Sequence, residues 1–428
     1  MGRDSQLDQA VLSRIVAAEA SRSPNRLVYI FENAPHPHER VTAGDLARAG
    51  NQIAASFMAA GLRPGDPVAV MLRNHPEFIH TMVANAKLGL PTVPVDHRAR
   101  GERLAWLLAY TPCSALVTAD YVVADPSAAT VIADSGVPTW VLSTPEGRAE
   151  NLDYPTGWHY LNRILLGGAG PDVGEHVTDL GAPWLLLPTT GRDGEVEFLE
   201  VPWERMALLR AVPGWVGYRP DDVAYTGLTL AHGNALALTA IPALTRAVHH
   251  SVISRWFTKR RLWSICAEFG ATTWASVGEI ASAVYSLPSS DADRAHPVRL
   301  VVSSGMPAGV WRAFEQRYGV AVTEWYGTME GAFACNPAGT GPIGSFGRPP
   351  AGVGEMDVID GAGRPVPARA VGELVFRPPG GHAWMPTGET VTRDDDGWLY
   401  AAYRGPDEPS LRATHIDTAR PRPKPLSA

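Results

Sequence analysis

The sequence predicts an α/β protein with two stacked α/β subdomains, mainly parallel sheets and a small C-terminal β-rich subdomain. Over most of the 428 residues, short apolar runs typical of buried strands alternate with segments whose apolar residues recur every three or four positions. Such alternation implies parallel strands joined by crossover helices. After about residue 342 the pattern changes to short strand-like segments separated by Gly and Pro.

The first subdomain is expected over residues 1–170. The segment TAGDLARAGNQIAASFMAAGL (42–62) begins with a Thr suited to cap a helix and stops at Gly61, so a helix is predicted. Strand and helix patterns then follow in the order DPVAVML, HPEFIHTMVANAKLGL, PTVPVD, RGERLAWLLAYTP and SALVTAD. Residues 144–183 are rich in Gly, Pro and polar residues, which indicates a connecting region.

The second subdomain is expected over residues 171–341, and the β-rich subdomain over residues 342–408. In the second, strands are predicted at WLLLP, DDVAYTGLTL, HHSVIS, ATTWAS and PVRLVVSS. Helices are predicted near 234–247 and in TKRRLWSICAEFG, EIASAVYSL and PAGVWRAFEQRYG. The β-rich subdomain contains GVGEMDVID, VGELVFRP and DGWLYAA. Residues 409–428 lack apolar periodicity and end in alternating Pro and basic residues, so a flexible tail is expected.

Composition and charge favour small molecules or proteins as ligands. The net charge of -7 and the pI near 6.0 give no reason to expect nucleic-acid or anionic-membrane binding, since both need clustered positive charge. No apolar stretch approaches the roughly 20 residues of a membrane span, and the N-terminus lacks a signal-peptide pattern. The three cysteines, Cys113, Cys266 and Cys335, show neither zinc nor disulfide spacing, so a reduced, cytoplasmic location is expected.

Five segments carry a resemblance to a known family: LAHGNAL (230–236), VRLVVSSGMP (298–307), EWYGTMEG (324–331), the Gly- and Pro-rich stretch 341–381, and PTGETVTRDDDGWLYAAYRGPDE (386–408). In this order and at these spacings they resemble the adenylate-forming superfamily, which includes acyl-CoA synthetases, luciferases and the adenylation domains of peptide synthetases. Residues 41–96 are also similar to the start of that fold, so the resemblance covers about residues 20–408. The segments AHGNA and ATTWASVGEIASAV look most like relatives of carnitine-CoA ligase and the fatty-acid transport proteins.

The resemblance implies a site for ATP or AMP with Mg²⁺. In the family's YGxTE motif the Tyr stacks on adenine and the Glu coordinates magnesium, and Tyr326 and Glu330 occupy these places, around Gly327 and Thr328. Met329 stands where a phosphate-binding Thr is expected, and a Met offers no hydrogen-bond donor.

Further nucleotide contacts are implied on both sides of that motif. Ser304, Gly305 and Met306 resemble the loop that walls the adenine pocket. Glu389 replaces the ribose-binding Asp of the family's TGD motif, and Arg404 resembles the hinge arginine that contacts ribose and phosphate.

The phosphate loop departs from the family pattern. In LLLPTTGRDGEVEF (185–198), Thr189, Thr190 and Gly191 match the loop, whereas Pro188 replaces a Gly and Asp193-Gly194 replaces the Pro-Lys pair. Glutamates follow where a triphosphate needs positive charge. Losing one preorganised donor typically costs about 10²- to 10³-fold in rate, so weak ATP binding is expected.

The acyl pocket is expected to bind a small carboxylic acid or another acyl-type ligand. His232 resembles the His at the mouth of the family's pocket, and Asn234, Trp274 and Ser276, with Gly305, are expected to line it. An α-amino acid is disfavoured, because AHGN lacks the Asp that peptide synthetases set against the substrate amine.

Three functions stay open. The first is ATP-dependent activation of a carboxylic acid, with Thr189, Thr190, Glu330 and Arg404 as catalytic residues. The second is a repurposed biosynthetic enzyme that uses the pocket without ATP, and the third is a pseudoenzyme that works with a protein partner supplying missing functions. The sequence ends 20 residues after Glu408, so the resemblance implies that the family's C-terminal domain, with its catalytic Lys and its surface for coenzyme A or a carrier protein, is missing.

Overall fold

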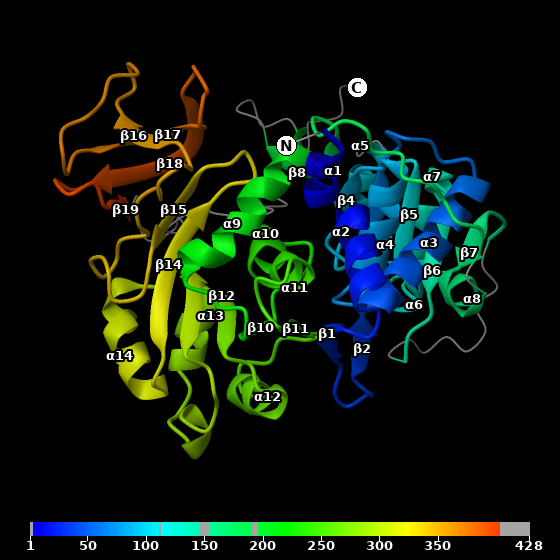
Figure 1. Cartoon of the computed structure of the whole chain (residues 1–428), viewed down its shortest axis with the longest axis horizontal. Helices are drawn as coiled ribbons and strands as arrows, with labels where there is room; N and C mark the ends of the chain where they lie inside the picture. The colour runs from blue at the N-terminus through cyan, green and yellow to red at the C-terminus, as the bar shows by residue number, and fades with distance from the viewer. Residues whose placement is uncertain (1–2, 111–112, 146–154, 169, 191–195, 403–428) are drawn as a thin grey trace. The chain divides into compact units, whose positions relative to one another are not determined.

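The computed structural model describes residues 3–110, 113–145, 155–168, 170–190 and 196–402; at 3, 110, 188–190, 196 and 197 it describes the backbone alone. The chain forms two compact units, one of residues 3–27 and 34–206, the other of residues 28–33 and 207–402. Figure 1 colours the elements by residue number, from the blue helices near the N-terminus through green and yellow to the orange strands β16 to β18.

The first unit contains a seven-stranded sheet in the order β7-β6-β5-β3-β4-β8-β9. All neighbours are parallel except β8 and β9. Its elements are α1 Arg3–Ala10, α2 Leu12–Arg22, β2 Glu39–Thr42, α3 Ala43–Ala59, β3 Val68–Val70, α4 Pro76–Leu88, β4 Thr92–Pro94, α5 Gly101–Tyr110, β5 Ala115–Ala119, α6 Asp120–Val123, α7 Pro126–Ser135, β6 Thr139–Leu142, β7 Trp158–Tyr160, α8 Leu161–Leu166, β8 Pro183–Thr190, β9 Val196–Pro202 and the 3₁₀ turn η1 Trp203–Arg205.

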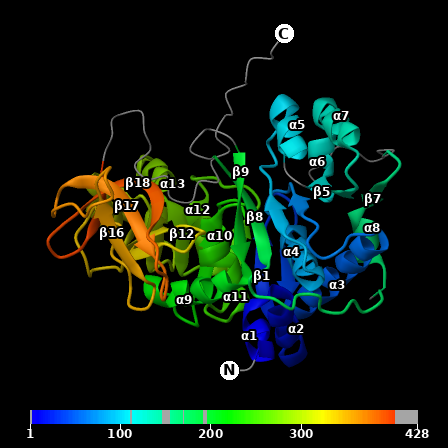
Figure 2. The ribbon, with the colours of Figure 1, turned by 90° about the horizontal axis from the view of Figure 1, so that it is seen from above.

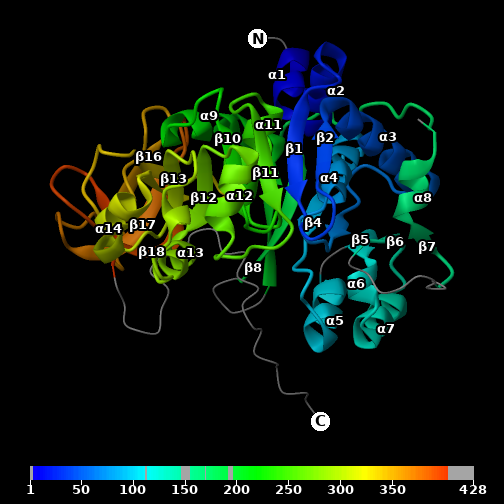
Figure 3. The same ribbon diagram turned by 90° about the horizontal axis from the view of Figure 1, so that it is seen from below.

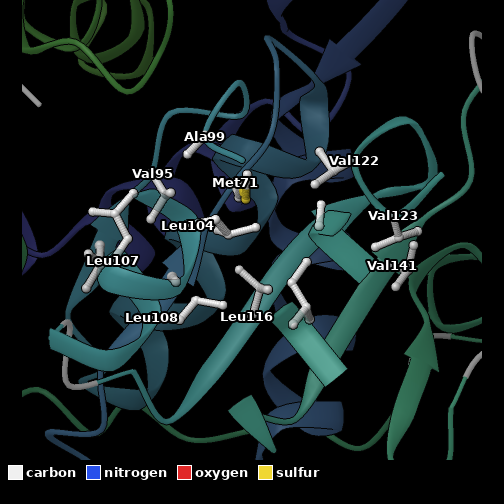
Figure 4. Packing of buried hydrophobic residues seen from close by; sticks show 14 of the residues in the cluster. Met71, Val95, Ala99, Leu104, Leu107, Leu108, Leu116, Val122, Val123 and Val141 are labelled. Atoms are coloured by element: carbon white, nitrogen blue, oxygen red, sulfur yellow. The ribbon is translucent and has the colours of Figure 1, made fainter. Parts of the chain in front are cut away.

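Burial of one apolar cluster holds the helices α5, α6 and α7 against this sheet. Met71 and Val95 follow β3 and β4, Leu116 lies on β5, and Leu104 and Leu107 face them from α5. Figure 4 shows these side chains packed together, with Val141 of β6 beside them. All are less than 5 % exposed, so each apolar side chain contributes about 1.5–3 kcal/mol of burial.

The second unit contains most of a second mainly parallel sheet, in the order β15-β14-β13-β12-β10-β11-β1. Only the pairing of β14 with β15 is antiparallel. Its elements are β1 Leu27–Glu32, α9 Met206–Val216, β10 Val223–Thr226, α10 Gly233–Ala235, the π-helix η2 Leu236–Ala240, α11 Ile241–Leu244, β11 His250–Ser254, α12 Leu262–Phe269, β12 Thr273–Val277, α13 Gly278–Tyr285, the 3₁₀ turn η3 Asp291–Asp293, β13 Leu300–Ser304, α14 Ala308–Tyr318, β14 Ala321–Gly327 and β15 Phe333–Asn336. Helices α13 and α14 lie against β12, β13 and β14 (Figure 3).

A small antiparallel sheet completes the second unit. It consists of β16 Glu355–Ile359, β17 Val371–Arg377, β18 Met385–Arg393 and β19 Leu399–Ala401, in that order across the sheet. Figure 2 shows β16, β17 and β18 side by side. Val358, Leu374 and Val391 pack on Tyr326 and Phe346, so an apolar core joins this sheet to the end of β14.

The predicted fold class is therefore confirmed: two mainly parallel sheets with helices, and a small antiparallel sheet. The proposed limits of the subdomains at residues 170 and 341 stay a prediction. The connecting region 144–183 contains the short strand β7, parallel to β6, and the helix α8. None of the described helices combines the length and the hydropathy needed to cross a bilayer.

Candidate functional site

Four neighbouring parallel strands of the second unit end in segments that sequence analysis selected. Strands β10, β12, β13 and β14 are parallel, so their carboxyl ends share one edge of the sheet. After them come the segments 230–236, 276–278, 304–306 and 327–331, respectively. Ligands of open α/β sheets bind at the carboxyl ends of strands, which makes this edge the candidate site.

The turn after β10 is fixed by two contacts of Asn234. Its backbone N–H donates to Nδ1 of His232 over 3.1 Å, so His232 caps α10 and carries its own proton on Nε2 when neutral. Its side-chain Nδ2 donates to the carbonyl of Ser276 over 3.2 Å. Three predicted pocket residues from two neighbouring strands are thus connected directly.

A close backbone approach joins the ends of β12 and β13. A Cβ on Gly278 would lie only 1.7 Å from the carbonyl oxygen of Gly305, so no other residue fits there. Gly305 itself has a φ of 88°, which favours glycine. The predicted residues Ser304, Gly305 and Met306 therefore form a tight turn directly beside the first residue of α13.

Glu324 on β14 anchors this turn, and sequence analysis did not select it. Its carboxylate accepts hydrogen bonds from the backbone N–H groups of Gly305 and, over 3.0 Å, of Met306. The side chain is buried, and desolvation raises its pKa from 4.5 to about 8 against the opposing effect of the two amides. A charged residue inside the apolar strand AVTEWYG was the signal that could have revealed it.

Tyr326 and Glu330 occupy contrasting environments. The ring of Tyr326 is fully buried, with its centroid 5.2 Å from that of Phe346. Adenine could stack on this ring only after a neighbour moves. Glu330 is exposed in a turn closed by the hydrogen bond from Gly331 N–H to the carbonyl of Thr328, 3.1 Å long, and its carboxylate forms no ion pair within the described part of the chain.

Glu389 lies close enough to Tyr326 to act on it electrostatically. Burial raises the pKa of the Tyr326 hydroxyl, and the carboxylates of Glu389 and Glu330 raise it further. In the TGE segment on β18, the Glu389 N–H donates to Oγ1 of Thr387 over 3.2 Å. The structure therefore brings the predicted adenine, ribose and magnesium positions together.

Met329 packs over the turn after β10. Its Sδ lies 3.4 Å from the position that a Cβ on Gly233 would take. The side chain that replaces a hydroxyl in the resemblance thus covers the His232–Asn234 turn with an apolar group.

The remaining predicted residues take no part in these contacts. Trp274 is 1 % exposed and packs edge-on against Trp263 of α12, with centroids 5.7 Å apart. Its role as a pocket residue stays a prediction. Thr189 and Thr190 end β8 in the first unit, and Gly191 and Arg404 lie outside the described residues.

The described residues include no preformed cluster of three or more His, Cys, Asp or Glu side chains able to hold a metal. Nucleotide-bound Mg²⁺ needs only one or two carboxylates, because phosphate oxygens and waters complete its shell. The exposed carboxylate of Glu330 fits this limited role.

Comparison with known proteins gives relatives among acyl-CoA ligases. Over 327 residues the chain is 27% identical to the medium/long-chain-fatty-acid–CoA ligase FadD6 of Mycobacterium tuberculosis, covering 76% of this chain and 51% of that protein. It is 24% identical over 404 residues to crotonobetaine/carnitine–CoA ligase of Salmonella paratyphi C, covering 88% of this chain and 76% of the ligase. The chain thus spans about half the length of FadD6.

A solved structure and a family model match the chain as well. ATP-bound MatB from Rhodopseudomonas palustris superposes with a TM-score of 0.75 at 19% identity, over 91% of this chain and 78% of MatB. The model of the AMP-binding enzyme family matches residues 16–160 and 204–383, which include every described segment of the candidate edge. The chain therefore belongs to the AMP-binding enzyme family.

Proposed function

We propose that this protein activates a small carboxylic acid with ATP and Mg²⁺, forming an acyl adenylate. A carboxylate oxygen attacks the α-phosphorus, the bond to the β,γ-phosphates breaks, and pyrophosphate leaves. The observation that carries the proposal is the convergence of the four segments at the carboxyl edge of β10, β12, β13 and β14. Family membership and the similarity to two acid–CoA ligases support it.

The roles proposed for individual residues follow their surroundings. Glu330 supplies a carboxylate to Mg²⁺ at the exposed end of its turn. Glu389, 6 % exposed, offers oxygens to ribose hydroxyls, and the Gly305 turn forms one wall of the adenine site. His232 and Asn234 lie on the acyl side. Such a site accelerates in-line displacement mainly by positioning and electrostatics.

A second function, binding of an acid or thioester without nucleotide, is favoured by two observations. Glu324 already accepts from the N–H groups of Gly305 and Met306, so these two amides of the expected adenine wall offer no free donor to a nucleotide. Met329 places a thioether where a phosphate donor is expected. Under this alternative the acid or thioester binds beside His232 and Asn234, and no nucleotide binds.

The deciding experiment measures nucleotide binding and pyrophosphate release. Calorimetric titration with ATP plus Mg²⁺, and separately with AMP, is expected to give binding, and a screen of small acids is expected to give pyrophosphate. Glu330→Gln should lower magnesium-dependent turnover about 100-fold or more, because it removes the charge that holds the metal.

The control is Glu102→Gln, a loss of one exposed carboxylate in the first unit, which should leave turnover unchanged. Equal turnover of the Glu330 variant and the wild type would refute the role of Glu330. Acid binding with neither nucleotide bound would favour the second function.

A further inference from the structure

The side chain of Asn234 is fully buried but only half satisfied. Its Nδ2 donates to the carbonyl of Ser276 over 3.2 Å. Its Oδ1 has no hydrogen-bond partner among the described residues. The whole residue is 0 % exposed, so a water molecule or a ligand reaches the free oxygen only after a neighbouring side chain moves.

The orientation of this amide follows from its partner. The carbonyl of Ser276 can only accept, so the amide must present its NH₂ group to Ser276 and its oxygen to the other side. A buried acceptor without a donor loses solvation and gains nothing in return, which makes such groups rare in native proteins. The free oxygen of Asn234 can therefore accept a hydrogen bond from a donor outside the described residues, which supply none.

The place of Asn234 indicates where that donor comes from. It stands at the second residue of α10, between the His232 cap and the neighbouring turn of Ser276, at the candidate edge. Met329 covers the preceding Gly233 with an apolar thioether, so the surroundings are of low polarity. A hydrogen bond formed there is strengthened by the low local dielectric.

A second feature beside Asn234 also points to a ligand. Residues Leu236–Ala240 form a π-helix directly after α10. Single π-helical turns are rare and occur frequently at functional sites. The irregular turn and the unsatisfied amide thus adjoin each other in one short segment.

We propose that Oδ1 of Asn234 accepts a hydrogen bond from the acid that this protein activates, so that its substrates are carboxylic acids with a hydroxyl or amide N–H donor on the acyl part. This inference rests on the proposed function and specifies its substrate. Purely hydrocarbon acids leave the oxygen unsatisfied. Ammonium-bearing acids are disfavoured as well, since a neutral amide cannot offset the desolvation of a buried charge.

The test compares matched acids on the wild-type protein. The probes are hydroxybutanoates and hydroxybenzoates with the hydroxyl at each position, their methyl ethers, and butanoate and benzoate. Binding is measured by calorimetry with and without ATP and Mg²⁺, and turnover by pyrophosphate release. At least one hydroxy acid should exceed its ether and its parent acid about 10- to 100-fold, the range expected when a buried acceptor regains its donor.

Asn234→Leu keeps the approximate side-chain volume and removes the acceptor, so it should reduce this preference to within about twofold. The matched control is Asn85→Leu in the first unit. Asn85 is also buried, donates from Nδ2 to Thr92 over 2.9 Å, and has an Oδ1 without a partner among the described residues. The control should retain the wild-type preference.

The outcomes separate this inference from the proposed function. Pyrophosphate release from all acids without preference for the hydroxy forms overturns the inference and leaves the activation chemistry intact. Preferred binding of a hydroxy acid without any pyrophosphate release supports the role of Asn234 and overturns ATP activation. Failure of all acids to bind overturns both.

Discussion

At the scale of single residues, Glu324 is an ionisable group that the fold uses as an internal anchor. Its carboxylate holds two consecutive amides, those of Gly305 and Met306, from inside the sheet. Because burial raises its pKa to about 8, the group changes charge near neutral pH while the fold is intact. The turn at the candidate edge is therefore coupled to pH.

This coupling predicts the direction of a pH effect on stability. Between the ordinary pKa of 4.5 and the folded value of about 8, the folded state binds a proton that the unfolded state releases. The contribution of Glu324 is thus complete below about pH 4.5 and is lost as the pH rises through 8. Relative to Glu324→Gln, the wild type should lose on the order of 3–5 kcal/mol between pH 5 and pH 9.

Urea unfolding of both proteins across this pH range measures the difference, in which the other titrating groups largely cancel. The exposed Glu102→Gln serves as a control and should track the wild type. Parallel curves for wild type and Glu324→Gln would show that the carboxyl titrates alike in both states.

The sequence could not predict how deeply each site residue is buried or which side chains surround it. The sequence predicted a strand at ATTWAS, which contains Trp274, and the resemblance selected Tyr326, yet both side chains are almost fully buried in aromatic or apolar clusters. Strand periodicity separates two faces but does not tell which face a ligand reaches. The anchoring by Glu324 likewise depends on the fold of β13 relative to β14.

At the scale of elements, capping residues and apolar periodicity predicted the helices whose ends are fixed by neighbouring residues. The Thr42 expected to cap a helix does so, with Asp45 completing a reciprocal capping box at the start of α3. The π-helix η2 and the short pair β7 and α8 were not predicted. Strand β7 is ordered by pairing with the preceding strand β6, which its own three residues do not indicate.

The junction of β12 with α13 gives a test at this scale. Gly278→Ala should destabilise the protein by about 2–4 kcal/mol, because the new methyl group meets the backbone of Gly305 and the two turns must separate. It should also weaken ligand binding at the edge. Thermal unfolding and calorimetry measure the two effects.

Gly309→Ala is the matched control on the next helix, α14. A Cβ at Gly309 meets no atom within 4 Å, so Ala there should stabilise by about 0.5–1 kcal/mol. A Gly278 variant as stable as the wild type would mean that the two turns do not touch in solution.

At the scale of the whole molecule, the order of the chain does not follow the order of the units. Residues 28–33 belong to the second unit although first-unit residues flank them on both sides. Strand β1 pairs with β11, and the Tyr29 hydroxyl donates to the carbonyl of Ala240 over 2.7 Å. The alternation of strands and helices predicted the class of both sheets, but nothing in the sequence near residue 30 indicated this remote pairing.

The division into units predicts which amides respond to a local change. Tyr29→Phe removes one buried hydrogen bond, so hydrogen exchange should accelerate about fivefold in β1 and β11 and stay unchanged in β5. Trp140→Phe removes the hydrogen bond from Trp140 Nε1 to Ser56 Oγ (2.9 Å) in the first unit. It should accelerate exchange in β5 and leave exchange in β1 and β11 unchanged. Equal acceleration in both units after either change would show that they open together.

The position of β1 also matters while the protein is being made. More than 200 residues separate Tyr29 from Ser251, its partner on β11, so a ribosome working at about 5–20 residues per second needs roughly 10–45 s to deliver the second after the first. During this interval the apolar segment LVYIF lacks its parallel partner strand β11. A delay in elongation between residues 29 and 251 lengthens the time for which the apolar strand β1 is without β11. The same delay after β11 has been made does not.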